Sequence, residues 1–511
     1  MSSEVRSVDA RSGESRPTGV RETSPVEVAL LTTRAAGAAG WLADADRTTR
    51  AALLDAVAAE LDHDAGAIIE AADRETALGT IRLEVELART SYQLRFFGEV
   101  VRDGGYLDVV IDHADPAALP APRPDLRRML VPLGPVAVFG ASNFPLAFSV
   151  PGGDTASALA AGCPVVVKAH PGHPVTSELA GAAINRALAD AGAPAGTFSL
   201  VYGEEAGLAL VRDREVRAVG FTGSLRGGRA LFDEATSRAD PIPFYGELGS
   251  LNPLVVTRAA AGVRSDDIGG GSAASVLLGM GQFCTKPGLL FVPTGRAGDS
   301  VVKTFLGTLA AAAPGHLLTA RTRTALVAGT ADVLGTPGVQ VLHRASGEGD
   351  AVGPVAVQIT AERLIAEDAG PLLDEHFGPF AVIVRYLDDI DLRAALLAVP
   401  ASLTATVQGA GEADPQLGPL IELLSGQSGR VVVDGYPTGV AVSWAMQHGG
   451  PYPASTAADH TSVGAAAIRR WLRPVTYQGV PQSLLPAELQ DSGVPGLSRR
   501  VNGRLDVVRG S

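Results

Sequence analysis

The spacing of apolar residues along the 511-residue chain changes near residue 105. From about 25 to 105, apolar side chains recur three and four residues apart, as in ALLDAVAAELDHDAGAIIEAA, which predicts amphipathic helices. A proline-rich joint, ADPAALPAPRPD, follows. Short β-branched runs then alternate with helical stretches, and the expected strands lie in VPLGPVAVFG, GCPVVVKAH, SLVYG and AVGFTG. This alternation indicates βαβ units around a parallel sheet.

The same alternation begins again after residue 246. Strands are expected in LNPLVVT, GLLFVP, AVIVRY and TATVQG, and helices at 299–313, 319–328, 361–367 and 413–426. This second block is expected to end near residue 445. A short helix and the run LRPVTYQGVP then predict that the chain returns to the body of the molecule. The fold class is therefore α/β with two parallel-sheet domains.

Composition and charge exclude several classes of protein. Acidic residues outnumber basic ones by 55 to 42, a net charge of -13, which argues against a broad nucleic-acid-binding surface. No apolar stretch reaches the roughly 18 residues of a membrane helix, and the polar N-terminus does not resemble a secretory signal. Residues 1–24 are expected to form a flexible tail. We expect a cytoplasmic protein without a membrane or nucleic-acid partner.

The cysteines and histidines give little indication of a metal site. Cys163 and Cys284 lie far apart without a CxxC motif, which excludes a disulfide framework or a structural zinc site. His170 and His173 form an HxxH, but the intervening Pro-Gly prevents a shared helical face. No metal is expected, and none of the nine histidines stands out by its sequence context.

Two strand ends carry residues suited to phosphate or polar ligands. In FTGSLRGG, Gly223 permits close backbone approach, and Ser224 would cap a helix whose N-terminal amides could face a pyrophosphate. An ordinary strand–turn–helix cap explains the same motif. In FGASNFP, Asn143 is either a neutral amide donor or a turn residue.

Cys284 and Glu247 are candidates for acid–base and nucleophilic chemistry. Cys284 lies in GMGQFCTKPG, where nearby backbone amides suit a reactive thiol, although a buried inert cysteine is the commoner case. Cys163, in AAGCPVVV, fits that inert case. Glu247, in GELGS, is either a surface carboxylate or a general base that is free to move.

Six short motifs occur in one order along the chain: SNFP, VVKAH, FTGS, GELGS, GQFC and EHFGP. This ordered set resembles the aldehyde dehydrogenase superfamily over about residues 25 to 480. The resemblance implies that Cys284 is the nucleophile, Glu247 the general base and Asn143 an oxyanion donor. It also implies that a dinucleotide is bound by Phe139, Gly140, Ser142, Lys168, His170, Pro171, Gly223, Ser224, Gly228, Leu248, Glu375 and Phe377.

Within that superfamily, the stretch from residue 131 to 180 is similar to α-ketoglutaric semialdehyde and NADP-dependent fatty aldehyde dehydrogenases. The resemblance implies oxidation of 2,5-dioxopentanoate to 2-oxoglutarate, with a fatty or aromatic aldehyde as the alternative substrate. NADP is expected, with NAD also accepted, because Pro171 stands where NAD-preferring relatives often carry Glu. A substrate carboxylate would require an arginine, for which Arg89, Arg95 and Arg469 are candidates. A non-catalytic member is disfavoured because Cys284, Glu247 and Asn143 are all present.

The resemblance also implies the domain organisation. Residues 25–114 and 133–246 would form a Rossmann-like cofactor-binding domain, and residues 247–445 a catalytic domain. Residues 115–132 and 465–511 would form an oligomerisation arm and C-terminal return, implying a homodimer or homotetramer.

The basic residues are almost all arginine, and the three lysines are Lys168, Lys286 and Lys303. A compact ammonium at Lys168 suits a cofactor ribose. Lys286 either assists the Cys284 thiolate or faces solvent, and Lys303 is expected on the surface.

Overall fold

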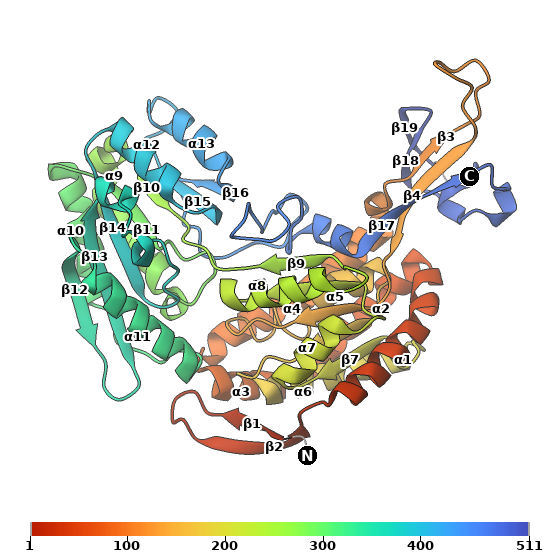
Figure 1. Ribbon diagram of the computed structural model, residues 1–511, viewed down its shortest axis with the longest axis horizontal. Coiled ribbons are helices and arrows are strands. Elements are labelled where there is room, and N and C mark those ends of the chain that lie inside the picture. Colours follow the sequence, from red (N-terminus) through yellow and green to blue (C-terminus); the bar gives the residue numbers. More distant parts are fainter. Residues whose placement is uncertain (1–2, 509–511) are drawn as a thin grey trace.

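The structure, a computed structural model, describes residues 3–508 and contains two α/β domains and a β-sheet arm (Figure 1). Residues 1–2 and 509–511, part of the expected tail and C-terminal return, lie outside the described residues. The α/β class with parallel sheets agrees with the expectation from the sequence.

The first domain is built on a parallel sheet with the order β7-β6-β5-β8-β9. Its elements are α1 (Pro25–Asp44), α2 (Arg47–His63), α3 (Ala65–Thr76), α4 (Thr80–Asp103), β5 (Val136–Phe139), α5 (Gly153–Ala161), β6 (Val165–Lys168), α6 (Pro174–Asp190), β7 (Phe198–Val201), α7 (Glu204–Arg212), β8 (Ala218–Thr222), α8 (Leu225–Ser237) and β9 (Phe244–Glu247).

Both faces of this sheet are buried, and successive side chains alternate between them. Val136 and Val138 pack against α2, α4, α5 and α6, whereas Ala137 and Val219 pack against α1, α7 and α8. Burial on both faces explains why these strands are continuous apolar runs in the sequence.

The second domain is built on a larger sheet with the order β12-β13-β14-β11-β10-β15-β16, in which β12 is antiparallel to β13 and the other pairs are parallel. Helices α9 and α10 cover one face, and α11, α12 and α13 cover the other. Its elements are β10 (Leu254–Val256), α9 (Arg258–Leu277), η2 (Leu278–Gly281), β11 (Leu289–Pro293), α10 (Arg296–Ala310), α11 (Ala320–Gly335), β12 (Gln340–Ser346), β13 (Val352–Thr360), η3 (Ala361–Ile365), η4 (Gly370–Leu372), β14 (Phe380–Tyr386), α12 (Asp389–Ala398), β15 (Ser402–Gln408), α13 (Leu417–Ser425) and β16 (Ser428–Val433).

The arm projects from the first domain at the upper right of Figure 1. It joins residues from both ends of the chain in a sheet with the order β17-β4-β3-β18-β19. Its elements, with the turns that lead into them, are η1 (Gly105–Leu107), β3 (Val110–Asp112), β4 (Leu126–Pro132), η5 (Ala465–Trp471), β17 (Leu472–Gln478), η6 (Gln482–Leu484), η7 (Ala487–Leu489), β18 (Ser498–Val501) and β19 (Arg504–Val507). The expected arm began at residue 115, but β3 already belongs to it.

The prediction of a flexible N-terminal tail is wrong for most of residues 1–24. An antiparallel hairpin, β1 (Glu4–Val8) and β2 (Ser15–Arg21), covers this segment. It is anchored by hydrogen bonds to α3, because Ser7 Oγ donates to Glu75 Oε1 at 2.7 Å and the Ala10 amide donates to the Arg74 carbonyl at 2.9 Å. Docking through polar groups explains why hydropathy alone did not reveal the hairpin.

Other local expectations also need correction. The helix expected at 361–367 is only the 3-10 turn η3, and helices α9 and α12 lie where none was expected. Strands β12, β13, β9 and β16 were likewise missed. β12 and β16 are largely half-exposed or exposed, whereas the mostly buried β13 and β9 contain Gly, Pro or polar residues that interrupt the apolar run. Within the described residues, no helix is both long enough and apolar enough to span a bilayer.

A buried ion pair fastens the C-terminal segment to the first domain. Arg470 of η5 lies 2.6 Å from Asp154 of α5, and their side chains are 3% and 11% exposed. The neighbouring Trp471 indole donates to Ser157 Oγ at 2.8 Å. Removing one partner from such a pair leaves an uncompensated buried charge.

We therefore predict that Asp154→Asn lowers the free energy of unfolding by about 3 kcal/mol. The matched change Asp233→Asn breaks an exposed pair with Arg229 on α8 and is predicted to cost less than about 1 kcal/mol. Urea unfolding monitored by tryptophan fluorescence measures both. Equal midpoints for the two variants would contradict this assignment.

Candidate active site

Four of the motif segments meet at the carboxyl ends of the strands in the first domain's sheet. Asn143 follows β5, Lys168 ends β6, Gly223 and Ser224 follow β8, and Glu247 ends β9. The carboxyl ends of parallel strands lie on one side of the sheet, and open α/β sheets bind ligands there. The topology thus gathers side chains that are widely separated in the sequence.

Cys284 follows η2 of the second domain and reaches the same place. Its Sγ lies 3.5 Å from Nε2 of His448, and Nδ1 of that ring lies 2.5 Å from Oε2 of Glu247. His448 and Glu247 are almost fully buried, with side chains 3% and 7% exposed. The three side chains form a line in which the histidine separates the thiol from the carboxylate.

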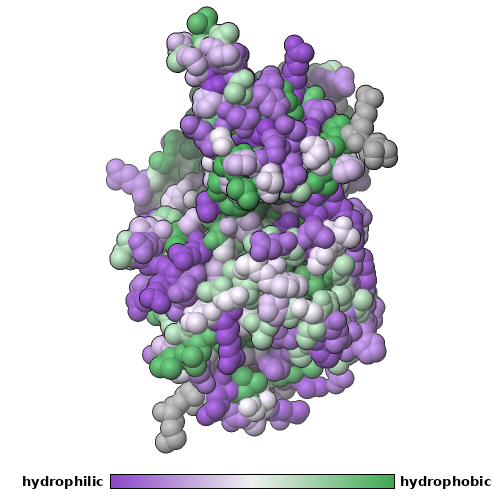
Figure 2. Space-filling view, turned by 90° about the vertical axis from the view of Figure 1, so that its right-hand side faces the viewer, coloured by the Kyte–Doolittle hydropathy of each residue, from purple (hydrophilic) through white to green (hydrophobic). Residues whose placement is uncertain are grey.

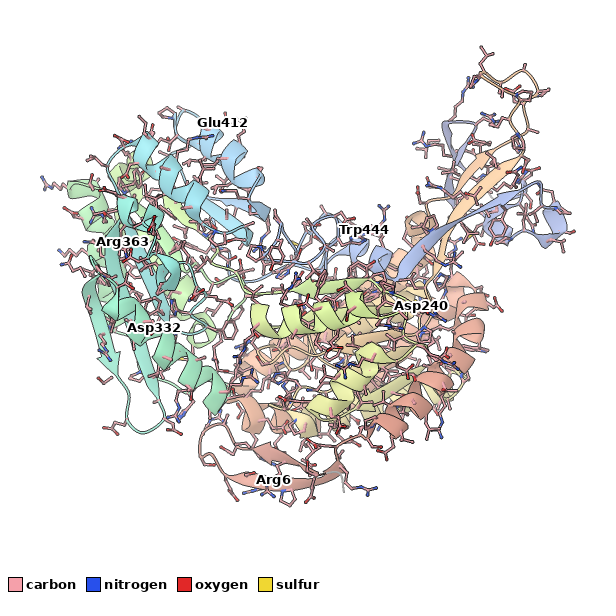
Figure 3. All side chains as sticks on the ribbon, viewed as in Figure 1. Arg6, Asp240, Asp332, Arg363, Glu412 and Trp444 are labelled. Atoms are coloured by element: carbon pink, nitrogen blue, oxygen red, sulfur yellow. The ribbon has the colours of Figure 1, made fainter. Side chains whose placement is uncertain are left out.

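His448 comes from residues 434–464, an irregular segment between β16 and η5. This segment extends the edge of the first sheet, because the Leu248 amide donates to the Ala454 carbonyl at 2.8 Å. The His448 amide donates to Thr461 Oγ1 at 2.9 Å, which fixes the backbone at the ring. Trp444, labelled in Figure 3, lies on the same segment.

The charges around His448 favour its protonated form. Burial by itself would lower the pKa of the imidazole, but the negative charges of Glu247 and Cys284 outweigh it and raise the pKa to about 10. These interactions favour the imidazolium form at neutral pH, and this form loses its proton only as the pH rises toward that value. A positive charge at this position is the partner that a cysteine nucleophile needs.

Asn143 lies beside the cysteine loop. Its Nδ2 donates to the carbonyl of Gln282, two residues before Cys284, at 2.9 Å, and its side chain is buried. Arg82 of α4 donates from Nη2 to the Asn143 carbonyl at 2.8 Å. The amide is thereby held where it could donate to an oxyanion formed at Cys284.

Lys286 is buried and does not face solvent. Its Nζ donates to the carbonyls of His376, Gly378 and Phe380 at 2.8, 3.3 and 2.9 Å. It therefore fastens the loop of the cysteine to the EHFGPF segment before β14. These contacts give Lys286 a positioning role, which neither of the two alternatives from the sequence, assisting the thiolate or facing solvent, had included.

Glu375 and the half-buried Phe377 belong to the segment that Lys286 holds. Glu375 lies against Gly249, where a Cβ would come within 2.7 Å of Oε2. Burial raises the pKa of Glu375 and lowers that of Lys286, and each charge opposes the shift of the other. A carboxylate in this position can accept hydrogen bonds from sugar hydroxyls.

Helix α8 begins directly at the end of β8, as the FTGS motif predicts. Ser224 is its N-cap, and its Oγ accepts from the Gly227 amide at 3.3 Å. Gly228 lets the helix pack closely, since a Cβ there would clash with Leu248 Cδ2. The exposed first turn leaves backbone amides and the positive helix end available to a phosphate.

Lys168 lies at the adjacent end of β6 among acidic groups. Burial lowers the pKa of Lys168, while the nearby carboxylates of Glu204 and Glu22 raise it. His170 supports the following turn, because its Nδ1 accepts from the Gly172 amide at 3.0 Å. Pro171 lies exposed on that turn.

The remaining expected cofactor residues line the end of β5. The Phe139 ring packs 6.1 Å from that of Phe221, and Gly140 allows close approach because a Cβ would lie 2.6 Å from Ser149 Oγ. Ser142 is half-buried in the loop that leads to Asn143.

Comparison with protein families matches residues 8–414 to the model described as the aldehyde dehydrogenase family. The chain belongs to the aldehyde dehydrogenase family. Cys284, His448, Glu247 and Asn143 thus lie together in a family member at the junction of its two domains.

Two curated relatives match most of the aldehyde dehydrogenase chain. "Alpha-ketoglutaric semialdehyde dehydrogenase 2" of Azospirillum brasilense is 47% identical over 465 residues, 89% of this chain and 87% of that protein. "Alpha-ketoglutaric semialdehyde dehydrogenase" of Acinetobacter baylyi is 42% identical, with the same coverage of 89% and 87%.

Solved structures share the fold at low sequence identity. A 1-pyrroline-5-carboxylate dehydrogenase superposes with a TM-score of 0.78 at 19% identity, covering 93% of this chain and 90% of that one. An E. coli NADP-dependent enzyme gives 0.78 at 20% identity, with coverage of 93% and 94%. A Thermus 1-pyrroline-5-carboxylate dehydrogenase with bound NAD gives 0.77 at 19%, with coverage of 93% and 90%.

Sequence reasoning missed His448. It lies 164 residues after Cys284, and its local sequence, MQHGGP, resembles an ordinary turn. The available signal in the sequence was the pair of glycines after His448. The structure explains one of them, because a Cβ at Gly450 would lie 2.6 Å from the Ser402 carbonyl oxygen. Close backbone packing beside a polar residue marks a constrained site rather than a free loop.

We predict that His448→Ala slows alkylation of Cys284 by iodoacetamide at least 10-fold at pH 7, with the rate recovering as the pH rises. The reason is loss of the positive charge beside the sulfur. His63→Ala, on the exposed end of α2, is the control and is expected to match the wild type. A pH profile of alkylation that His448→Ala leaves unchanged would refute the pairing.

Proposed function

We propose that the protein oxidises 2,5-dioxopentanoate to 2-oxoglutarate with NAD(P), through a thioester on Cys284. The observation that carries this proposal is the Cys284–His448–Glu247 line beside the Asn143 amide. The identity of 42–47% to two α-ketoglutaric semialdehyde dehydrogenases supports the substrate.

The residues at the carboxyl ends of the first sheet's strands, together with Glu375 and Phe377 of the second domain, fit a dinucleotide. The α8 N-terminus offers amides to a pyrophosphate, and Lys168 and Glu375 offer an ammonium and a carboxylate to the two riboses. When bound, the nicotinamide supplies the hydride acceptor for the oxidation. Phe377 would support the nicotinamide, and Lys286 holds the segment that carries it.

The first step forms a bond between Cys284 Sγ and the aldehyde carbon. The thiolate attacks, and the electron pair of the carbonyl bond moves to oxygen. The Asn143 amide and the Cys284 backbone N–H donate to this oxyanion. Loss of one such donor typically costs about 2.7–4 kcal/mol of transition-state stabilisation. Loss of hydride from the substrate carbon then leaves a thioester on Cys284.

His448 connects this step to hydrolysis. Once the sulfur is acylated, its negative charge no longer raises the pKa of His448, so the imidazolium can release its proton to solvent. The neutral ring, oriented by Glu247, then takes a proton from the attacking water. Expulsion of the carboxylic acid restores the thiolate and its imidazolium partner. We expected Glu247 to be the direct base, and the geometry instead favours its action through His448.

The proposal predicts different defects for two variants. Cys284→Ala should abolish turnover. Glu247→Gln should retain a burst of reduced cofactor equal to about one per active site and then turn over at least 100-fold more slowly, because deacylation is impaired. Stopped-flow absorbance at 340 nm measures both. Near-native turnover of Cys284→Ala would defeat the mechanism.

Features near Lys168 act in opposite directions on cofactor choice. Pro171 removes a carboxylate that would repel a 2′-phosphate, and we propose on that basis that NADP is used. Glu204 and Glu22 place negative charge near the same lysine and weaken this preference.

We predict that Glu204→Gln raises the ratio of kcat/KM for NADP to that for NAD at least 5-fold, since it removes one repelling charge. Glu205→Gln, the exposed neighbour on α7, is the matched control. A wild-type ratio below one would overturn the proposed NADP preference. An unchanged ratio in Glu204→Gln would show that the Glu204 charge does not act on the bound cofactor.

One observation favours the alternative substrate, a fatty aldehyde. A cavity of about 670 Å³ opens beside α4, and apolar side chains of Leu78, Ile81, Val85, Leu278 and Phe283 form much of its wall. Relative rates on decanal and 2,5-dioxopentanoate separate the two substrates.

We also propose that the arm pairs with a second copy and that the protein is cytoplasmic. The arm carries strongly exposed apolar side chains, including Leu119 at 93% and Leu505 at 70%, and Figure 2 shows apolar residues among polar ones on that side of the molecule. Both cysteines are free thiols, which suits a reducing compartment.

A further inference from the structure

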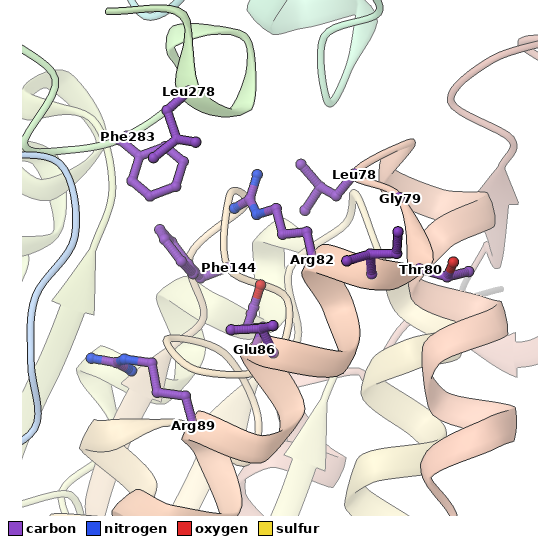
Figure 4. Close-up of a pocket in the computed structure, with 11 residues that line it drawn as sticks. Leu78, Gly79, Thr80, Arg82, Glu86, Arg89, Phe144, Leu278 and Phe283 are labelled. Atoms are coloured by element: carbon purple, nitrogen blue, oxygen red, sulfur yellow. The ribbon is translucent and has the colours of Figure 1, made fainter. Parts of the chain in front are cut away.

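Three ionisable side chains project from one face of α4 into the cavity of about 670 Å³. Arg82, Glu86 and Arg89 are spaced four and three residues apart, so they lie on successive turns of the same helix face. Figure 4 shows them in a row, with Phe144 and Phe283 on the opposite side. The two guanidinium groups outnumber the single carboxyl group in a cavity whose other lining is largely apolar.

Each of the two arginines has an unused donor. In the described part of the chain, Nη1 of Arg82 and Nη1 of Arg89 are buried without a hydrogen-bond partner. A buried guanidinium nitrogen without a partner is costly. A ligand with acceptor oxygens would relieve that cost, and a carboxylate matches the planar fork of arginine.

Arg82 already contacts the loop that carries Asn143. Its Nη2 donates to the Asn143 carbonyl, and its Cζ lies 5.0 and 4.9 Å from the ring centroids of Phe144 and Phe283. Glu86 holds the same loop, since its Oε1 accepts from the amides of Leu146 and Ala147 at 2.9 and 3.0 Å. These two side chains position Asn143.

Arg89 is held less tightly than Arg82. Its Nη2 makes one long hydrogen bond, 3.3 Å to the Val440 carbonyl, and its Cζ lies 5.1 Å above the Phe148 ring. Cys284 is close enough for its charge to raise the pKa of Arg89, although burial lowers it more. The charge of Cys284 also raises the pKa of Arg430, although burial lowers it more. The guanidinium of Arg430 already donates to the carbonyls of Pro437 and Gly439 at 2.6 and 3.1 Å.

The other two arginines that were candidates from the sequence do not line this cavity. Arg95, two turns further along α4, pairs with Asp62 at 2.7 Å, and Arg469 is exposed on η5. Of the three candidates, Arg89 is the one that lines the cavity.

We propose that Arg89 binds the distal carboxylate of the aldehyde substrate and thereby selects short acids with a terminal aldehyde over uncharged aldehydes. This inference rests on the proposed function, in that the aldehyde end of the same molecule reacts at Cys284. Binding uses the free Nη1 and replaces the long contact to Val440. The apolar wall then packs against the short carbon chain, and Arg82 and Glu86 keep Asn143 in place.

The test compares three substrates in the full-length enzyme: 2,5-dioxopentanoate, succinic semialdehyde and pentanal, which has five carbons and no charge. For Arg89→Met we expect the ratio of kcat/KM for 2,5-dioxopentanoate to that for pentanal to fall at least 100-fold, mainly through KM. The ratio for Arg89→Lys should lie between those of the wild type and Arg89→Met, because an ammonium group cannot bind a carboxylate bidentately. Arg95→Met is the matched control on the same helix, and its ratio should equal that of the wild type.

A second measurement does not depend on aldehyde turnover at the charged substrate. Glutarate should inhibit pentanal oxidation competitively in the wild type and at least 10-fold more weakly in Arg89→Met. An unchanged substrate ratio and unchanged glutarate inhibition in Arg89→Met would overturn the proposal. So would an equal loss on all three substrates, which indicates a purely structural role.

The outcomes also separate this inference from the proposed function. If the wild type oxidises succinic semialdehyde well and 2,5-dioxopentanoate poorly, and Arg89→Met loses the former, the carboxylate site stands and the proposed substrate fails. If the wild type oxidises 2,5-dioxopentanoate well and Arg89→Met keeps its ratio, the function stands and the Arg89 assignment fails.

Discussion

The buried charge line from Glu247 through His448 to Cys284 is the interaction on which the site depends. Its members come from the edge strand of the first sheet, the connecting segment after β16 and a loop of the second domain. Burial alone would leave His448 neutral, and two negative partners reverse that preference. The domains must therefore be docked correctly before the nucleophile has its counter-charge.

Several features serve this docking. The His448 segment pairs with the edge of β9, Lys286 ties the cysteine loop to the segment of Glu375, and Arg470 fastens the C-terminal return to α5. Each uses buried polar groups whose alternative is an unsatisfied donor or charge. Such contacts define one arrangement more sharply than apolar packing does.

Helix α4 provides a comparable link on the substrate side. Arg82 and Glu86 hold the loop of Asn143, and Arg89 one turn further faces the same cavity. A substrate held at its far end by this helix is therefore placed against an oxyanion donor held by the same helix. Recognition and chemistry share one rigid element, which favours accurate positioning.

Much of this was accessible from the sequence, and the failures have physical causes. The α/β class followed from apolar runs, and Cys284, Glu247 and Asn143 were expected at one site because their motifs occur in a characteristic order. His448 was not found, because its role arises from contacts between distant segments, and the two glycines that follow it give only a weak local signal. The N-terminal hairpin was missed because it docks through hydrogen bonds to Glu75 and Arg74 rather than through apolar burial. Lys286 was noticed by composition alone, and its three carbonyl partners became visible only in the structure.

The central claim is that His448 is an imidazolium paired with Cys284 and Glu247, and nitrogen-15 NMR of histidine-labelled protein tests it most directly. The His448 signals are assigned by their absence in a His448→Gln sample. We expect imidazolium shifts at pH 7 that titrate only near pH 10, and a lower midpoint in Cys284→Ala. A neutral His448 ring at pH 7 in the wild-type protein would contradict it.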